Sequence, residues 1–437
     1  MNKEELIKKA KEYELNNEWQ LALDIYDKLY NDYPKEEYFL EKKAWCYSRL
    51  LKYDDAIKHF IMLTEKEPNT AKWCYCVGYQ YYMKENWRDA NKWFEKALLI
   101  YHDYLIVLYR YAYSLRQLCG SKMVLKKDEF WTALKLLVGC DFIWRGYSAE
   151  QKKKYEKTYA SICFLHAKLL IERNNIDNAI KYLEKALLIK PESEEYKYQL
   201  SKNYLTLGNI EKAKEVFPRN LKKYYVNELE IDILIAEKKH LEAIEKYKDL
   251  LKYRKKDYIY RKLGMQYYEI NNLNDAILCI LHAEKINNNN HLTQFAKAKI
   301  LYKAGFLAEA KKIAEISASL KVKNYSSEFI EAVEFSKTMK QIMDDKSYLS
   351  DNEQDLNNFI HQLSTEKDNS KIIGRVKRYN SERGFGFIEC NNIEYFFHIS
   401  NVCKELQDKI TKGMMFSFLP VQTAKGLSAI NISKPSE

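Results

Sequence analysis

The chain repeats itself every 34 residues over most of its length. Alanines and aromatic residues both keep this step: Ala22, Ala56, Ala90, Tyr26, Phe60 and Phe94. Small residues keep it too, at Ala10, Ala44 and Gly78. Unrelated amphipathic helices would not hold one register over many units. The constant step therefore predicts a supersecondary unit that cannot bury its apolar face alone and stacks on its neighbours.

The same pattern resumes after a gap and continues to about residue 310. Its later members are the following: Ala167, Ala179, Leu183, Ala186, Ser201, Tyr204, Ala213, Phe217, Ala243, Tyr247, Gly264, Tyr267, Ala276, Ala283, Ala298, Leu301 and Ala310. The small residue at the eighth position of each 34-residue unit, such as Ala10, lets the two helices of the unit approach closely. The alanine at the twentieth position, such as Ala22, lets the next helix pack there. The few glycines (12) and prolines (6) also favour long helices joined by short turns.

These positions resemble the tetratricopeptide repeat, a pair of antiparallel helices in each 34 residues. The resemblance covers roughly residues 1–320 and implies an all-α superhelix whose groove binds a protein or peptide. The lysine and asparagine set that clamps a C-terminal carboxylate in some members of the family has no match here. The resemblance therefore leaves the ligand of the groove open.

Two irregularities interrupt the repeats. The register lapses between Tyr104 and Tyr159, which we interpret as one degenerate unit with an insertion; a local partner site is the alternative. Another step is shorter, because Ala213 and Ala243 are 30 residues apart. This shorter step predicts a tightened turn near Pro218.

The pattern fades after Ala310. Residues 326–343 predict a last helix and residues 351–364 a shorter one, which together cap the array. Residues 364–370, "STEKDNS", are small and polar and predict a flexible linker. We therefore predict a helical array over residues 1–345, a short helix and linker over 346–370, and a second domain over 371–437.

Beyond Ser370 the periodicity changes from helical to alternating. Strands are predicted over residues 371–380, 385–390, 393–400, 413–421 and 426–433, with "NN" as a tight turn between the second and third. Five short strands in about 65 residues suit a small antiparallel barrel. The fold class is thus multidomain, with an all-α array followed by a small all-β barrel.

Four rings fall on one face of the hairpin formed by the second and third of these strands, because residues two apart in a strand share a face. They are Phe385, Phe387, Phe396 and His398. Tyr395, Phe397, Ile399 and Ile388 point the other way and can fill the core. Exposed rings need an explanation, and cations flank them at Lys377, Arg378, Arg383 and Lys425. Rings for base stacking beside cations for phosphate are what a single strand of nucleic acid requires.

"RGFGFI", "EYFFH", "GRVKRYN" and "AKGLSAINI" resemble the motifs of the cold-shock domain, an OB-fold that binds single-stranded RNA and DNA. The resemblance covers residues 371–433. It implies base stacking by Phe385, Phe387, Phe396 and His398, with Lys377 and Tyr379 beside them and a nucleic-acid contact at Lys425. The family's exposed tryptophan is Arg378 here, and its phenylalanine after the histidine is Ile399. The platform is therefore smaller, and we expect weaker or more context-dependent binding.

Composition and motifs speak against several classes of protein, among them secreted, membrane-spanning, zinc-binding and catalytic proteins. The net charge of +11 permits nucleic-acid binding without demanding it. The N-terminus is charged and unlike a signal peptide, and no apolar run approaches the length that spans a membrane. The nine cysteines form no C-x-x-C pair, which speaks against zinc and favours reduced thiols in the cytoplasm. We find no phosphate-binding loop, zinc-protease or hydrolase motif, and expect no catalytic residue, metal or cofactor.

The sequence thus predicts a non-catalytic adaptor. Its barrel binds single-stranded nucleic acid, RNA ahead of DNA, and its array binds an unidentified protein or peptide. One alternative is an effector or regulator with an unrecognised nuclease-like site in the repeat region. Another is a protein scaffold whose barrel has lost nucleic-acid binding.

Overall fold

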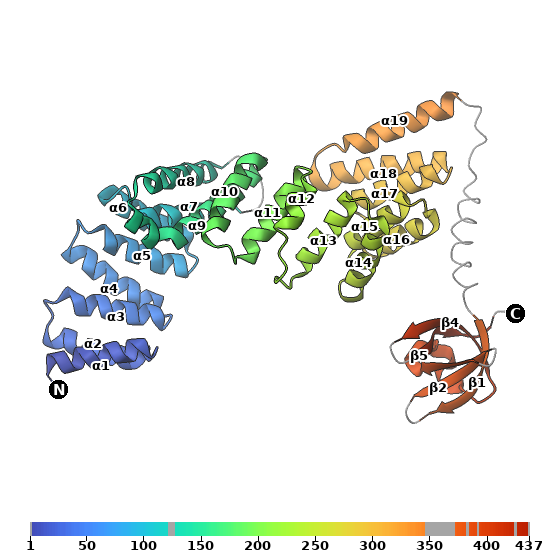
Figure 1. Ribbon diagram of the computed structural model, residues 1–437, viewed down its shortest axis with the longest axis horizontal. Helices are drawn as coiled ribbons and strands as arrows, with labels where there is room; N and C mark the ends of the chain where they lie inside the picture. The colour runs from blue at the N-terminus through green and yellow to red at the C-terminus, as the bar shows by residue number, and fades with distance from the viewer. Residues whose placement is uncertain are drawn as a thin grey trace. The chain divides into compact units, whose positions relative to one another are not determined.

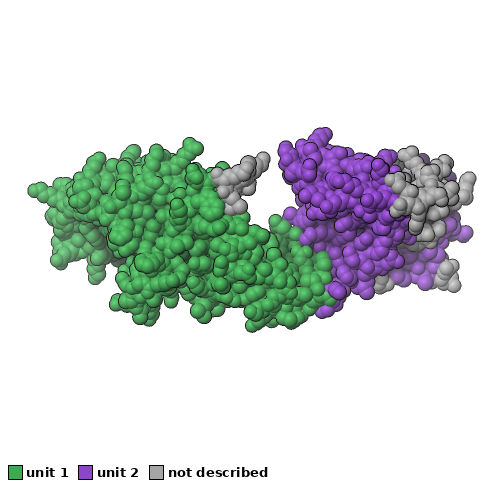
Figure 2. Space-filling view, turned by 90° about the horizontal axis from the view of Figure 1, so that it is seen from above, with its two compact units in different colours: residues 1–237 green, residues 238–437 purple. Residues whose placement is uncertain are grey.

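The computed structural model describes residues 2–120, 127–345, 372–381, 384–390, 393–423 and 426–435. The chain divides into two compact units, residues 1–237 and 238–437, coloured green and purple in Figure 2. The first unit is helical. The second contains further helices and a small β-barrel (Figure 1).

In the first unit each helix packs against the next helix in the chain. Their bounds are α1 Lys3–Leu15, α2 Trp19–Asp32, α3 Glu37–Arg49, α4 Tyr53–Lys66, α5 Ala71–Met83, α6 Trp87–Ile100, α7 Leu105–Cys119, α8 Asp128–Gly146, α9 Ala149–Glu172, α10 Ile176–Ile189, α11 Glu194–Thr206, α12 Ile210–Glu215 and α13 Tyr224–Ala236. The first six alternate between 13 and 14 residues. Each of the first three 34-residue repeats thus consists of a 13-residue helix followed by a 14-residue helix, which is the predicted helix pair.

The turn inside each of the first three pairs repeats with the same period. Asn17, Leu51 and Glu85 adopt left-handed backbone, with φ near +60°. The residue after each donates its amide to a carbonyl five residues earlier, as Glu18 does to Tyr13 at 2.8 Å. Such a left-handed residue ends a helix and turns the chain at once, so the second helix can lie back on the first.

The packing rationale for the repeat is confirmed. Ala22, Ala56 and Ala90 are fully buried, as are the aromatic residues four positions later in α2, α4 and α6. At Gly78 an added Cβ would lie 2.8 Å from the ring of Phe94. A small side chain is therefore required where the two helices of a pair cross.

Residues around the lapse in the pattern form longer helices. In the described part of this region, α7 packs on α8, which has 19 residues, and α9 extends to 24. The core of this region is continuous with α6 and α10. The structure thus agrees with one degenerate unit whose helices are longer than those of its neighbours.

The prediction of a tightened turn near Pro218 is wrong. The short step between Ala213 and Ala243 comes from α12, which has only six residues and is followed by a non-helical segment up to Lys223. Proline lacks an amide hydrogen, clashes with the carbonyl four residues earlier and disfavours helix in the residue before it. Helix α12 therefore ends at Glu215, and the chain runs without helix over residues 216–223 before α13 begins.

The second unit continues the helical series and ends it. Its helices are α14 His240–Tyr253, α15 Asp257–Glu269, α16 Leu273–Ile286, α17 His291–Lys303, α18 Leu307–Tyr325 and α19 Ile330–Asp345. Helix α19 confirms that residues within the predicted range 326–343 are helical. The predicted short helix over 351–364 and the linker over 364–370 lie outside the described residues.

The described residues of the C-terminal segment include five strands: β1 Ile372–Asn380, β2 Phe385–Cys390, β3 Ile393–His398, β4 Met415–Thr423 and β5 Gly426–Ser433. They close into a barrel in the order β1-β2-β3-β5-β4, antiparallel except where β3 meets β5. The core contains Val376, Ile388, Phe397, Phe416 and Phe418, each at most 1% exposed. This closed, five-stranded arrangement is the predicted OB-fold.

Candidate nucleic-acid interface

Three phenylalanine rings meet on the outer face of the β2–β3 hairpin. Phe387 pairs with Phe396 across the two strands, and Phe385 pairs with His398. The ring centroid of Phe396 lies 5.9 Å from that of Phe385 and 5.7 Å from that of Phe387. Phe396 is 39% exposed, and His398 is exposed. We call these four side chains the ring platform.

A β-bulge brings the cations of β1 to the same face. Val376 pairs with Ile388, but the next pair is Arg378 with Phe387, so Lys377 is the extra residue. Gly374 and Val376 face the core, and strict alternation would have turned Arg378 inward as well. Because of the bulge, Lys377 and Arg378 are both exposed and Arg378 lies beside the ring platform.

Tyr379 lies on the inner side of β1. Its ring stacks on buried Phe397 with centroids 5.8 Å apart, opposite Gly386. A Cβ on Gly386 would lie 2.6 Å from both the Arg378 carbonyl and the Phe397 ring. Glycine is thus required for β1 to approach β2, and Tyr379 supports the platform from below.

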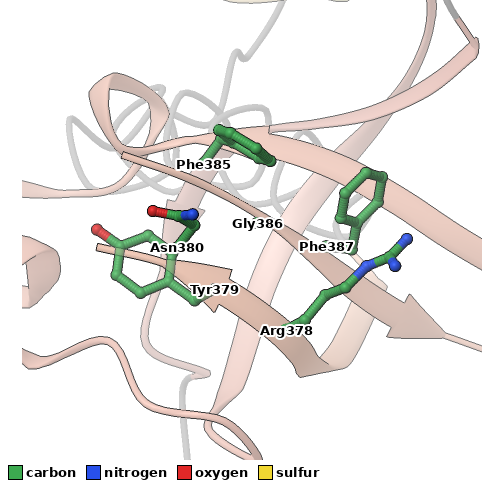
Figure 3. A pocket seen from close by; sticks show the side chains of 6 residues that line it. All are labelled: Arg378, Tyr379, Asn380, Phe385, Gly386 and Phe387. Atoms are coloured by element: carbon green, nitrogen blue, oxygen red, sulfur yellow. The ribbon is translucent and has the colours of Figure 1, made fainter. Parts of the chain in front are cut away.

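A hollow of about 340 Å³ opens between β1 and β2 (Figure 3). It is lined by Arg378, Tyr379, Asn380, Phe385, Gly386 and Phe387. Figure 3 shows the guanidinium of Arg378 extending to the ring of Phe387, while Tyr379 projects away from them. The lining combines ring faces with a cation and an amide, which suits a base and its neighbouring phosphate.

Two glutamates neutralise the cations. Lys377 Nζ lies 2.8 Å from Glu389 Oε1 and 2.9 Å from Glu394 Oε1. Arg378 Nη2 lies 3.1 Å from Glu394 Oε2, and its guanidinium carbon is 4.3 Å from the centroid of the Phe387 ring. The hydrogen bond from Lys377 holds the pKa of Glu394 below its ordinary value. The hydrogen bonds to Glu389 and Glu394 raise the pKa of Lys377. Both shifts favour the charged forms of Lys377 and Glu394.

The structure brings together most of the predicted site residues that it describes. Phe385, Phe387, Phe396, His398 and Arg378 share the outer face, and Lys377 stands at its edge. Arg383, Lys425 and the predicted turn at residues 391–392 lie outside the described residues.

Sequence reasoning missed Glu389, Glu394 and Asn380. A signal for the two glutamates was present, because the two-residue turn predicted at 391–392 would place Glu389 opposite Glu394, and the structure shows this pair. Their contact with Lys377 depends on the β1 bulge, which alternation alone does not predict.

Metal centres and membrane spans are both missing from the described parts of the chain. No group of three or more His, Cys, Asp or Glu side chains there is arranged to hold a metal ion. Among those helices, none is both long and apolar enough to cross a bilayer.

An OB-fold barrel with an exposed ring platform defines a class of small nucleic-acid-binding modules. The family model described as the 'Cold-shock' DNA-binding domain matches residues 372–435. The cold shock protein CspC of Bacillus subtilis is 39% identical over 62 residues, which are 14% of this chain and 94% of that protein. The cold shock-like protein CspC of Bacillus cereus is 37% identical over 62 residues and 95% of its length. Through this segment the chain belongs to the cold-shock domain family.

The helical array matches a second family model, described as the tetratricopeptide repeat, over residues 160–193 and 194–217. Among solved structures, a tetratricopeptide repeat protein from Parabacteroides merdae is 15% identical, covering 60% of this chain and 98% of its own, with a TM-score of 0.39. Yeast Tom70 is 13% identical, covering 77% of this chain and 95% of its own, with a TM-score of 0.37. The chain thus contains tetratricopeptide repeats at residues 160–193 and 194–217, within its helical array, and a cold-shock domain at residues 372–435.

Proposed function

We propose that this protein is a non-catalytic, cytoplasmic adaptor that holds single-stranded nucleic acid on the ring platform and a protein partner on its array. The observation that carries the nucleic-acid half is the platform itself. The rings of Phe385 and Phe387 lie 5.9 and 5.7 Å from that of Phe396, on the outside of a barrel whose core is already filled. Rings that the core does not need are suited to stacking against bases.

The protein half of the proposal is supported by a cluster of tyrosines around one arginine in the array. The guanidinium carbon of Arg110 lies 4.1 Å from the ring centroid of Tyr79, 5.3 Å from that of Tyr82 and 5.7 Å from that of Tyr75. Its Nε is buried and has no hydrogen-bond partner among the described residues. Rings satisfy the charge of a guanidinium but not its N–H donors. A carboxylate from a partner peptide would pair with the charge of the guanidinium through N–H donors other than the buried Nε.

Joining the two halves in one chain raises the local concentration of the partner near the bound strand. No new contact between partner and nucleic acid is needed for this effect. The proposal takes RNA ahead of DNA.

The decisive experiment removes single rings from the full chain. A labelled oligonucleotide, as RNA and as DNA of one sequence, is titrated by fluorescence anisotropy with wild type, Phe387→Ala and Phe396→Ala. Each truncation should cost about 1–3 kcal/mol of binding, with little change in salt dependence because no phosphate contact is lost. Phe142→Ala is the matched control, because Phe142 is an 80% exposed phenylalanine on α8.

Equal losses for Phe142→Ala and Phe387→Ala would contradict the proposal, as would no loss for either platform ring. Incubating the labelled strand with protein and Mg²⁺ tests the non-catalytic part, since a shortened product would contradict it. Tighter binding of the DNA strand than of the RNA strand would reverse the assigned preference.

A separate selection tests Arg110. Random decapeptides displayed on phage are selected on wild-type protein and on Arg110→Gln. The proposal predicts enrichment of aspartate and glutamate on wild type only. Enrichment that is the same on both proteins would remove Arg110 from the partner site.

A further inference from the structure

The Phe387 side of the ring platform is already occupied by a side chain of the protein itself. The Arg378 guanidinium carbon lies 4.3 Å from the centroid of the Phe387 ring, which is the separation of two groups in contact. A base inserted between them would need roughly twice the ~3.5–4.0 Å contact distance. The ring of Phe387 and a base can therefore stack face to face only if Arg378 leaves this position.

Glu394 holds Arg378 where it is. Its Oε2 accepts from Arg378 Nη2 at 3.1 Å, while its Oε1 lies 2.9 Å from Lys377 Nζ. Glu394 is two residues from Phe396 on the same strand, so its side chain shares the outer face with the rings. One carboxylate thus contacts both cations of the β1 bulge.

The charges of the side chains at the β1 edge of the ring platform cancel. Lys377 and Arg378 carry two positive charges, and Glu389 and Glu394 carry two negative charges within 3.1 Å of them. A phosphate that binds either cation must first replace a carboxylate oxygen. Binding at this edge is therefore an exchange of partners, in contrast to a free cation, which would bind a phosphate without giving up an existing partner.

We propose that Glu394 is an affinity-determining residue, which competes with nucleic acid for the cations beside the ring platform. It pins Arg378 over Phe387 and neutralises Lys377, and a single strand binds by taking the place of Glu394, with phosphate on the cations and a base on the uncovered ring. This inference rests on the proposed function, since it concerns the same platform. It adds that the chain contains a competitor for its own ligand.

The test is a substitution that should improve binding. Glu394→Gln keeps the size of the side chain and removes its charge, and it is titrated in the full chain with the same labelled RNA at several salt concentrations. Affinity should rise about two- to fivefold, the range for release of an exposed ion pair. The slope of log affinity against log salt should steepen by about 0.7 for each additional phosphate that the protein neutralises. A misfolded variant would lose affinity, so misfolding cannot account for a rise.

Glu331→Gln is the matched control, because it removes the same charge from an exposed position on α19, outside the barrel. It should leave affinity and slope unchanged. Glu389→Gln removes one of the two carboxylates that contact Lys377 and leaves Arg378 paired with Glu394, so it should give a smaller rise than Glu394→Gln. In an Arg378→Ala background the improvement from Glu394→Gln should shrink, because there is no longer a guanidinium to release.

Unchanged or weaker binding by Glu394→Gln would overturn the inference, and so would an equal rise for Glu331→Gln. These outcomes differ from failure of the proposed function. If Phe387→Ala and Phe396→Ala weaken binding while Glu394→Gln does not strengthen it, the platform binds nucleic acid and only the proposed competition by Glu394 is wrong. If the ring truncations have no effect, the proposed function itself fails.

Discussion

His166 makes the stability of the array depend on pH. It lies on α9 and is 3% exposed, and its ring packs at a tilt against that of Tyr182, with ring centroids 4.0 Å apart. Burial lowers the pKa of His166 to about 4, because the interior penalises the charged imidazolium. The buried Nδ1 has no hydrogen-bond partner among the described residues. The neutral ring is therefore the form that the fold accepts.

The consequence is a loss of stability in mild acid. An unfolded histidine binds a proton near pH 6.5, whereas folded His166 does so only near about pH 4. Between these values the unfolded state binds more protons, so stability falls as pH falls, by up to about 1.4 kcal/mol per pH unit. Urea unfolding of the full chain at about pH 7 and about pH 5 should show this loss. It should be smaller in His166→Gln and unchanged in His102→Gln, a histidine whose side chain is 85% exposed.

Glutamine at position 166 also removes packing, so the relevant measurement is the change with pH and not the stability itself. A pH-dependent loss in His166→Gln as large as in wild type would contradict the assignment.

At the residue scale, sequence predicted which side chains form the platform but not what they contact. The alternation of Phe385, Phe387 and Phe396 is local, so it can be read from spacing alone. The direction of Arg378 depends on one extra residue in β1, and the pairing of Lys377 with two glutamates depends on the register of three strands. Such contacts between strands follow from the closed barrel, and no local pattern encodes them.

At the scale of elements, Gly78 and Gly139 offer a matched pair of helix glycines with opposite expected effects. A Cβ at Gly78 in α5 would lie 2.8 Å from the Phe94 ring, whereas a Cβ at Gly139 in α8 would have no heavy atom within 4 Å apart from its chain neighbours and the nearby backbone of its own helix. Gly78→Ala should destabilise the array by about 1–3 kcal/mol through overpacking. Gly139→Ala should stabilise it by about 1 kcal/mol, because alanine favours helix.

Thermal unfolding followed by far-ultraviolet circular dichroism measures both variants. Stabilisation by both variants would show that helix propensity, and not the crossing of α5 and α6, decides the outcome at Gly78.

The helices themselves were predictable because every unit buries small and aromatic residues at the same positions, and these positions recur every 34 residues in the sequence. The end of α12 was not, although its cause is visible in the sequence. Pro218 lies three residues beyond the last helical residue, Glu215. The change in spacing shows that four residues are missing from the step but not which element lost them. A proline after a short polar helix terminates that helix, and the connection lengthens as a result.

At the scale of the whole molecule, the change of periodicity near residue 370 predicts parts that can be separated. Limited proteolysis of the full chain should cut first within residues 364–370, which are small and polar. Two fragments should remain resistant, one ending near residue 364 and one beginning near residue 371. Mass spectrometry of the products identifies the cut, and early cleavage spread through the repeats would contradict the prediction.

The six-residue helix α12 makes the array uneven along its length. It buries only Ala213, whereas α10, in the preceding pair, buries Ala179, Ile180, Leu183 and Ala186. In a linear stack each unit is stabilised mainly by its immediate neighbours, so the unit with the smallest buried surface opens first. Amide hydrogens of α11 and α12 should therefore exchange with solvent while those of α10 remain protected. The protein would then lose order from its middle, with its outer repeats still folded.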